Sequence, residues 1–222
     1  MKKPRICGVI VNKDLELIRG IEQLVDLFEV RIDFIGDGWQ ELAGRLRKPW
    51  IACNRIADEG GRWKGDERGR ISELLKAVDL GADIVDLELE TGNLDEIVGA
   101  IGKRSECILS FHELERTPPV NEMREIVHRQ LEAGADICKV ITTAQRFEDN
   151  LAVLQLITEF RKTRVVSFAM GPLGFTSRVL CPLVGGDFIY ASIERGKESA
   201  PGQITARELR KIYELGERWE IE

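Results

Sequence analysis

Gly134-Ala135-Asp136-Ile137-Cys138-Lys139-Val140-Ile141-Thr142-Thr143 is the stretch of this 222-residue sequence that says most about its fold. A glycine where a helical segment ends, followed at once by a short apolar run, is typical of the passage from helix to strand in a βα repeat. Gly81-Ala82-Asp83 repeats the signal before another apolar run. Strands buried on both faces read as continuous apolar runs, so a lysine in one is unexpected. The stretch predicts a buried parallel strand that carries one out-of-place charge, at Lys139.

The whole chain repeats this alternation of apolar runs and amphipathic segments. The spacing of apolar residues predicts helices over Leu15–Leu27, Ile71–Leu80, Met123–Leu131, Asn150–Phe160 and Thr205–Trp219. The apolar runs predict strands over Ile6–Val11, Phe28–Asp33, Trp50–Asn54, Ile84–Leu89, Cys107–Phe111, Ile137–Ile141, Val165–Ala169 and Phe188–Ala191. Because an open flavodoxin-like sheet needs only about five strands, this pattern favours an α/β fold of the (β/α)₈ TIM-barrel type. We expect one compact catalytic domain over residues 1–222.

Composition and charge limit the classes of protein that the chain can belong to. The 32 basic and 38 acidic residues give a net charge of −6, which argues against non-specific binding to nucleic acid. No apolar run is long enough to span a bilayer, and the start Met1-Lys2-Lys3-Pro4 has no signal-peptide pattern. The five cysteines are far apart and form no Cys-x-x-Cys pair, which favours a reducing compartment and no structural zinc. We therefore expect a cytoplasmic protein that binds neither membrane nor nucleic acid.

Polar residues follow most of the predicted strands, at the end where a barrel of this type carries its site. They come from separate strands and have charges of both signs: Glu29, Arg31, Asp33, Arg55, Glu59, Asp86, Glu88, Glu90, His112, Lys139 and Arg178. A barrel interior is normally filled with Val, Ile and Leu, so it has no structural need for these groups. The pattern predicts a functional site at the carboxyl ends of the strands.

Lys139 and His112 are the candidates for chemistry at this site. Burial of a lysine disfavours its ammonium form. The neutral amine that results can attack a carbonyl to form a Schiff base, which is the usual function of such a lysine. The alternative is a lysine near a strand end that extends its head group into water. His112 ends the neighbouring strand, and adjacent strands lie about 4.8 Å apart, so it is a candidate general acid–base that Glu59 could orient. A structural histidine is the alternative for His112.

Three arginines, Arg31, Arg55 and Arg178, follow three different strands. A guanidinium suits bidentate recognition of a carboxylate or of paired hydroxyls, so the set suggests a small anionic substrate. Arg31 could instead be paired with an acidic neighbour such as Asp33. The acidic set Asp86, Glu88 and Glu90 is interpreted as arginine partners and not as a metal site, because oxygen-ligand metal sites rarely include so many competing cations.

Two glycine-containing segments late in the chain leave alternatives open. The loop Glu194–Gln203 could be a mobile lid in which Ser199 and Gln203 offer hydrogen bonds, or a plain connection to a last helix capped near Thr205. The second segment is a glycine-rich loop that begins at Met170 and ends at Ser177-Arg178. Its glycines and two later ones could cradle a phosphate: Gly171, Gly174, Gly185 and Gly186. No glycine fingerprint at a helix start supports that function.

Taken in order, these segments resemble type I 3-dehydroquinate dehydratase in its short form, over nearly the whole chain. The resemblance rests on Glu29-Val30-Arg31-Ile32-Asp33, Cys53-Asn54-Arg55, Glu59-Gly60-Gly61, Ser110-Phe111-His112, Lys139-Val140, Met170-Gly171 with Gly174, Ser177-Arg178 and Ser199-Ala200-Pro201-Gly202-Gln203. It implies a (β/α)₈ barrel that removes water from 3-dehydroquinate by syn elimination through a lysine Schiff base, in the shikimate pathway. It implies no cofactor or metal, a small-molecule substrate and a homodimer.

The resemblance also implies a role for each site residue. Lys139 would form the imine, His112 would move the proton and Glu59 would hold His112. The substrate-binding set would be Glu29, Arg31, Arg55, Met170, Arg178, Ser199 and Gln203. Glu113, Cys53 and Asn54 depart from the family pattern, which affects local hydrogen bonds and not the reaction. The rival functions are a class I aldolase for a phosphorylated sugar and a catalytically inactive barrel that binds ligands or acts as a scaffold.

Overall fold

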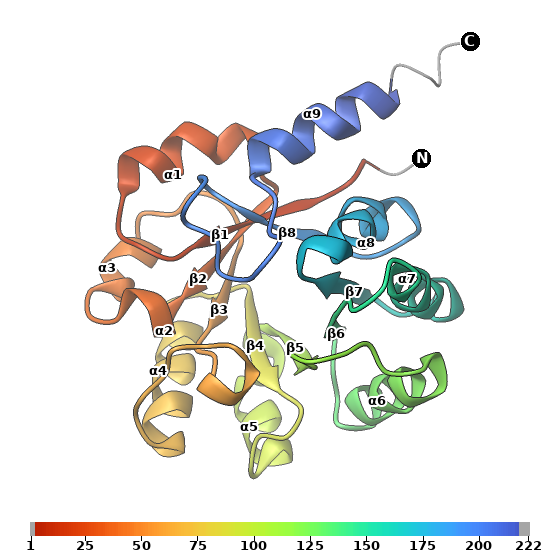
Figure 1. Cartoon of the computed structure of the whole chain (residues 1–222). Coiled ribbons are helices and arrows are strands. Elements are labelled where there is room, and N and C mark those ends of the chain that lie inside the picture. Colours follow the sequence, from red (N-terminus) through yellow and green to blue (C-terminus); the bar gives the residue numbers. More distant parts are fainter. Residues whose placement is uncertain (1–2, 218–222) are drawn as a thin grey trace.

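Eight parallel strands form one continuous sheet in the computed structural model, which describes residues 3–217 (Figure 1). The strands are β1 (Ile6–Ile10), β2 (Leu27–Arg31), β3 (Trp50–Cys53), β4 (Ile84–Glu88), β5 (Glu106–His112), β6 (Ile137–Thr143), β7 (Val165–Met170) and β8 (Ile189–Ser192). Their order in the sheet is β7-β6-β5-β4-β3-β2-β1-β8. The sheet curls into a nearly closed barrel, and the predicted (β/α)₈ fold is confirmed.

Helices surround the sheet and connect its strands (Figure 1). They are α1 (Leu15–Ile21), α2 (Ile32–Ile35), α3 (Trp39–Ala43), α4 (Glu67–Asp79), α5 (Leu94–Ile101), α6 (Val120–Glu132), α7 (Asp149–Glu159), α8 (Phe175–Leu180) and α9 (Ala206–Glu217). The five predicted helices correspond to α1, α4, α6, α7 and α9, although the prediction for the last one extends beyond the described residues, to Trp219. Within residues 3–217, no helix is long and apolar enough to cross a membrane.

Three sequence-based expectations about elements are wrong in detail. The helix predicted over Leu15–Leu27 stops much earlier, because the backbone is extended at Val25 and Leu27 already belongs to β2. The strand predicted to reach Asp33 ends at Arg31, where the short helix α2 begins. The glycine-rich loop predicted to end at Ser177-Arg178 instead contains α8, which carries both residues.

Aspartates at the starts of three strands align the bottom of the barrel. Each aspartate forms two hydrogen bonds with one residue at the start of the preceding strand. Its carboxylate accepts from the backbone N–H of that residue, and its own backbone N–H donates to the carbonyl of that residue. These pairs are Asp26 with Ile6, Asp83 with Trp50 and Asp136 with Cys107, at 2.8 to 3.1 Å. Two of them belong to the repeated Gly-Ala-Asp signal, in which Gly81 and Gly134 have φ values of 87° and 91°. The repeat therefore reflects a shared device that sets the height of successive strands.

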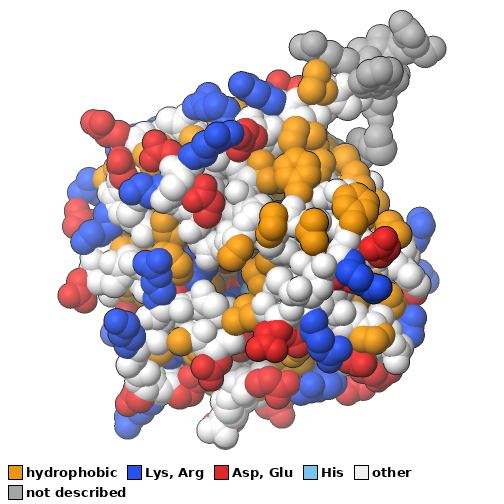
Figure 2. Space-filling view, in the orientation of Figure 1, with side chains coloured by type: hydrophobic (Ala, Val, Ile, Leu, Met, Phe, Trp, Pro, Cys, Tyr) orange, Lys and Arg blue, Asp and Glu red, His pale blue; other side chains and the backbone are white. Residues whose placement is uncertain are grey.

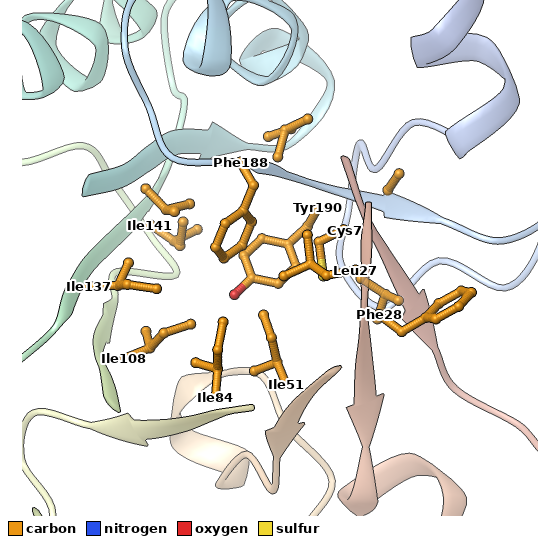
Figure 3. Close-up of a cluster of buried hydrophobic side chains, with 14 of the residues drawn as sticks. Cys7, Leu27, Phe28, Ile51, Ile84, Ile108, Ile137, Ile141, Phe188 and Tyr190 are labelled. Carbon is orange, nitrogen blue, oxygen red and sulfur yellow. The ribbon is translucent and has the colours of Figure 1, made fainter. Parts of the chain in front are cut away.

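The lower part of the barrel interior is apolar. Figure 3 shows isoleucine side chains from β3, β4, β5 and β6 that point towards the rings of Phe188 and Tyr190. Side chains alternate along a strand, so the residue two positions further on points into the barrel again, nearer the mouth. On the even-numbered strands that next level consists of Glu29, Asp86, Lys139 and Tyr190, all buried. The barrel interior thus changes from apolar to charged over two residues along these strands.

Candidate active site at the barrel mouth

A cavity of about 340 Å³ opens at the carboxyl ends of the strands. It is lined by every site residue that the sequence predicted: Glu29, Arg31, Arg55, Glu59, His112, Lys139, Met170, Arg178, Ser199 and Gln203. These residues come from β2, β5, β6, β7, α8 and the two connections that follow β3 and β8, so their convergence depends on the fold. The expected site is therefore present as one cavity, of a size suited to a small organic molecule.

Lys139 lies in the middle of β6 and is 5% exposed, so its head group does not extend into bulk water. Its Nζ is 2.8 Å from Oδ2 of Asp86 and 3.9 Å from Oε1 of Glu29. It also lies 4.4 Å from the centroid of the Tyr190 ring. The cost of burying the amine is thus offset by two carboxylates and one aromatic face, and the alternative of a lysine reaching into water is excluded.

His112 and Glu59 form a direct pair at the mouth. Nδ1 of His112 lies 2.7 Å from Oε2 of Glu59, which belongs to the helical turn Ala57–Glu59 after β3. Burial raises the pKa of Glu59 to about 7, against the opposing effect of Arg55. Burial, together with Arg55 and Lys139, lowers the pKa of His112 well below its usual value. With Glu59 ionised, a neutral His112 donates from Nδ1 and leaves Nε2 free to accept a proton.

Arg55 holds several acidic groups at once. Its guanidinium lies 2.6 Å from Oδ1 of Asp86, 3.1 Å from Oε1 of Glu88 and 3.7 Å from Oε2 of Glu59. Burial alone would raise the pKa of Asp86, but Arg55 and Lys139 outweigh it and hold that pKa below its usual value. Glu88 also accepts from Arg70 of α4 and from the backbone N–H of Ile56, at 3.2 Å in the second case. Through its contact with Ile56, Glu88 therefore anchors the turn that carries Glu59 to strand β4.

The prediction that Asp86, Glu88 and Glu90 are arginine partners holds for all three, but they do not share one place. Asp86 and Glu88 pair with Arg55 inside the barrel, whereas Glu90 lies beyond β4 and forms an exposed pair with Arg129. Arg31 also has an acidic partner, since Nε and Nη2 donate to the two oxygens of Asp33 at 2.9 and 2.7 Å.

One group of residues in the described part of the chain has the geometry to hold a metal ion. Ligand atoms of Glu29, Cys53 and Asp86 lie within 4.8 Å of one another. The amine of Lys139 contacts both carboxylates, and Arg55 contacts Asp86. An ion at this place would have to displace cations that the fold already supplies, so the residues present do not favour a metal.

Arg178 differs from the other arginines of the site. It is 1% exposed on α8, and none of the carboxylates that the structure describes lies within ion-pair distance of it. Nη2 donates to the carbonyl of Pro201 at 3.0 Å, the guanidinium stacks 4.5 Å from the centroid of the Phe168 ring, and Nε has no hydrogen-bond partner in the described part of the chain. Burial lowers the pKa of Arg178 below its usual range. A buried cation with unused donors that faces a cavity is a natural receptor for an anion.

The segment Ser199–Gln203 covers the cavity beside Arg178. The backbone N–H and the hydroxyl of Ser199 both donate to Oε1 of Gln203, at 2.8 and 3.2 Å. The carbonyl of Pro201 accepts from the N–H of Gly171 at 3.2 Å, which joins the segment to the end of β7. The expected cap of the last helix is confirmed, since Thr205 and Glu208 exchange hydrogen bonds at the start of α9. The expectation that this loop moves as a lid is untested.

The four glycines considered for a phosphate cradle do not come together. Gly171 and Gly174 follow β7 at the mouth, whereas Gly185 and Gly186 precede β8 at the opposite end of the barrel. At Gly174 a side chain would collide with the Ala169 carbonyl, which explains that glycine by packing. The phosphate-binding alternative has no support in the fold.

Two aromatic residues of the cavity, Phe168 and Tyr190, are absent from the sequence-based set. Both lie in apolar runs, where an aromatic residue reads as core. The alternation along Phe188-Ile189-Tyr190-Ala191-Ser192 is the signal that could have placed Tyr190 inside the barrel, two residues above Phe188.

Comparison with known proteins gives a consistent result. Residues 6–218 match the family model described as type I 3-dehydroquinase. The 3-dehydroquinate dehydratase of Dehalococcoides mccartyi strain BAV1 is 41% identical over 214 residues, which cover 96% of each chain. That of Methanosarcina barkeri is 35% identical over 230 residues, covering 96% of this chain and 95% of the relative.

Solved structures show the same likeness. Type I 3-dehydroquinate dehydratase from Clostridium difficile, crystallised with covalently modified comenic acid, superposes with a TM-score of 0.87 at 26% identity. The superposition covers 97% of this chain and 93% of the other. The 3-dehydroquinate dehydratase of Geobacillus kaustophilus gives a TM-score of 0.86 at 25% identity, over 98% and 93% of the two chains.

Proposed function

The chain belongs to the type I 3-dehydroquinase family, and from that premise we propose which of its side chains carry each step. The protein is a hydro-lyase of the shikimate pathway that removes water from 3-dehydroquinate to give 3-dehydroshikimate. One observation supports the proposal most directly. The amine of Lys139 is buried against Asp86 and Glu29 in the cavity that also holds the His112–Glu59 pair.

Lys139 forms the covalent link to the substrate. Its neutral amine attacks the ketone carbon, and the resulting carbinolamine takes up one proton at its hydroxyl, which leaves as water and gives a protonated imine. The positive nitrogen of this imine withdraws electrons from the neighbouring carbon and acidifies its protons. Asp86 and Glu29, which already face the amine, match the positive charge that the nitrogen retains.

His112 moves the proton. Its free Nε2 takes a proton from the carbon next to the imine, which gives an enamine, and Glu59 stabilises the imidazolium through Nδ1. The imidazolium then protonates the departing hydroxyl, which leaves as water while the enamine electrons return to form a conjugated imine. Hydrolysis of that imine releases the product and restores Lys139.

Substrate binding divides between the two sides of the cavity. Arg178 has unused donors, so it is assigned to the substrate carboxylate, with Ser199 and Gln203 as neutral partners. The ring hydroxyls face Glu29, Arg31 and Arg55, and Met170 packs against the ring. This arrangement differs from that of an aldolase for phosphorylated sugars, which needs a phosphate site in the late loops.

Trapping of the imine tests this assignment. Borohydride added with 3-dehydroquinate is expected to give a reduced adduct on Lys139, located by peptide mass spectrometry, and Lys139→Met should give none. Absence of a mass increase on Lys139 in folded wild-type protein would overturn the Schiff-base mechanism. His112→Ala is expected to form the adduct but to turn over roughly 10²–10⁴-fold more slowly, because it lacks the proton-transfer group.

A homodimer fits the distribution of exposed apolar side chains. Figure 2 shows hydrophobic side chains gathered on the side of the molecule where α7, α8 and α9 lie. The exposed ones in these segments are Phe147, Leu151, Leu173, Phe175, Leu183, Val184 and Leu215. An isologous interface uses the same patch on both subunits, so an apolar patch can pair with its own copy.

The dimer is testable in solution. Leu151→Glu is expected to halve the mass measured by light scattering, whereas Leu80→Glu, at another exposed leucine after α4, should leave it unchanged. Equal masses for both variants would exclude this patch as the interface. We further assign the reaction to a single catalytic domain over residues 1–222, and we expect it to take place in the cytoplasm.

A further inference from the structure

The charged level of the barrel interior contains one residue without a charge. Glu29, Asp86 and Lys139 come from β2, β4 and β6, and the corresponding position on β8 is Tyr190. In barrels of this type, four inward side chains from alternate strands form one layer. Tyr190 is thus the fourth side chain of the layer that surrounds the Lys139 amine. None of the proposed catalytic steps uses it.

The contact between Tyr190 and Lys139 is made by the ring. Nζ lies 4.4 Å from the ring centroid, and the two residues are 4% and 5% exposed. A cation over an aromatic face is attracted by the ring quadrupole, most strongly when both groups are desolvated. The ring also packs edge-on against Phe188, at 5.2 Å between centroids, and lies 6.4 Å from the ring of Phe168.

The hydroxyl of Tyr190 does not explain the residue. It is buried and has no hydrogen-bond partner among the described residues. In Figure 3 its oxygen points into the apolar cluster, on the side of Ile84 and Ile108. A buried hydroxyl without a partner costs stability. The useful part of Tyr190 is therefore its ring, which faces Lys139.

A ring contact has a property that the carboxylate contacts lack. The lysine ammonium has three N–H donors, whereas the protonated imine that replaces it keeps one. Lys139 donates to Asp86 at 2.8 Å, and Glu29 lies 3.9 Å away as an ion-pair partner, so imine formation leaves a single N–H for two carboxylates. Attraction to the aromatic face depends on the positive charge and not on the number of N–H bonds, so it persists when the amine becomes an imine.

We propose that Tyr190 is a positioning residue whose ring face holds the nitrogen of Lys139 in place and stabilises the protonated imine once it is made. The inference rests on the proposed Schiff-base function and deepens it. It predicts that the ring matters and the hydroxyl does not.

Two substitutions separate the ring from the hydroxyl. Tyr190→Phe is expected to match the wild type in kcat and in the fraction of Lys139 trapped by borohydride, and to unfold at an equal or higher temperature. Tyr190→Met fills similar space without a ring, and it should lower both kcat and the trapped fraction roughly ten-fold, with a smaller change in KM. That factor lies between those of an exposed and a fully desolvated cation–π contact.

Phe188→Met is the matched control for looser packing. Phe188 lies below Tyr190 and does not line the cavity, so this variant should lose stability but keep the wild-type trapped fraction. Normal trapping and turnover in folded Tyr190→Met would overturn the proposal, as would an equal loss in Tyr190→Phe or in Phe188→Met. Failure of the wild type to trap any adduct would instead overturn the Schiff-base function itself, so the two failures are distinguishable.

Discussion

The two sides of the cavity treat buried arginine in opposite ways. On the side formed by β2, β3 and β4, Arg55 has Asp86, Glu88 and Glu59 within ion-pair distance. On the side formed by β7, α8 and the loop before α9, Arg178 pairs with none of the carboxylates that the structure describes. We call these the paired side and the open side. Burial opposes the charge of both arginines, but acidic neighbours raise the pKa of Arg55, whereas that of Arg178 is lowered.

The difference shows which arginine has charge left for a ligand. The guanidinium of Arg55 is already neutralised by the protein, so an arriving anion gains little from it and competes with Asp86 and Glu88. Burial of Arg178 costs hydration free energy, and none of the described carboxylates offsets that cost by pairing with it. A substrate carboxylate can therefore form the whole ion pair without a competitor. The paired side therefore holds the catalytic groups in position, and the open side attracts the substrate.

The largest effect is expected from breaking the paired side. Arg55→Met leaves Asp86 and Glu88 buried with fewer partners, and loss of one member of a buried ion-pair network typically costs about 3–5 kcal/mol. Urea unfolding at pH 7 should show this loss. Arg178→Met is the matched control, because it removes a buried charge with no carboxylate partner and should leave the free energy of unfolding unchanged or higher. Equal losses in the two variants would contradict the distinction between the sides.

On the open side, Arg178→Met should weaken substrate binding. Arg178→Met is expected to raise KM for 3-dehydroquinate on the order of 10²–10⁴-fold, since a hydrogen bond to a charged group contributes about 1.5–3 kcal/mol and a bidentate contact makes two. Steady-state kinetics over a wide substrate range measures this. Arg178→Lys should recover part of the affinity, because it restores the charge without the planar fork. A KM close to that of the wild type would remove Arg178 from its role.

Much of this site could be predicted from the sequence, because Lys139 and His112 each interrupt or end an apolar run. A strand pattern shows such residues directly, and eight strands in βα alternation place them at one mouth. The contrast between Arg55 and Arg178 could not be predicted, since it depends on which carboxylates lie near each guanidinium in space. Tyr190 was missed because an aromatic residue in an apolar run has the same pattern whether it fills the core or faces a lysine. The sequence does not predict the short helix α8, because glycines and two prolines, Pro172 and Pro182, flank its six residues.

A third effect, on pH dependence, should come from Glu59. Its pKa is about 7 in the folded protein and 4.5 ordinarily, so between these values the folded state binds more protons than the unfolded state. The contribution of this group therefore favours folding at low pH and is lost as pH rises through 7, by on the order of 3 kcal/mol at 1.36 kcal/mol per unit of pKa. Unfolding free energies at pH 5 and pH 8 should show a drop in the wild type that is smaller in Glu59→Gln.

The same titration should appear in turnover. Below about pH 7, a protonated Glu59 donates to Nδ1 of His112, so the proton of the imidazole moves to Nε2 and that atom no longer accepts one. We expect kcat to fall as pH decreases through this range, with trapping of the imine much less affected. A kcat that stays constant from pH 8 to pH 5.5 would contradict this role for Glu59.

The smallest effect separates two glycines of the loop on the open side. Gly202 and Gly196 both have positive φ, of 74° and 79°, so alanine strains the backbone similarly at either position. At Gly202 an added Cβ would lie 2.4 Å from the carbonyl oxygen of Gly171, whereas at Gly196 nothing lies within 4 Å. Gly202→Ala should therefore lift the loop from the end of β7 and displace the Pro201 carbonyl that orients Arg178. We expect KM to rise roughly ten-fold, or about 1.4 kcal/mol, with Gly196→Ala near the wild type. Equal KM values in the two variants would mean that the contact of the loop with the end of β7 does not contribute to substrate binding. Arg178 alone would then account for binding on the open side.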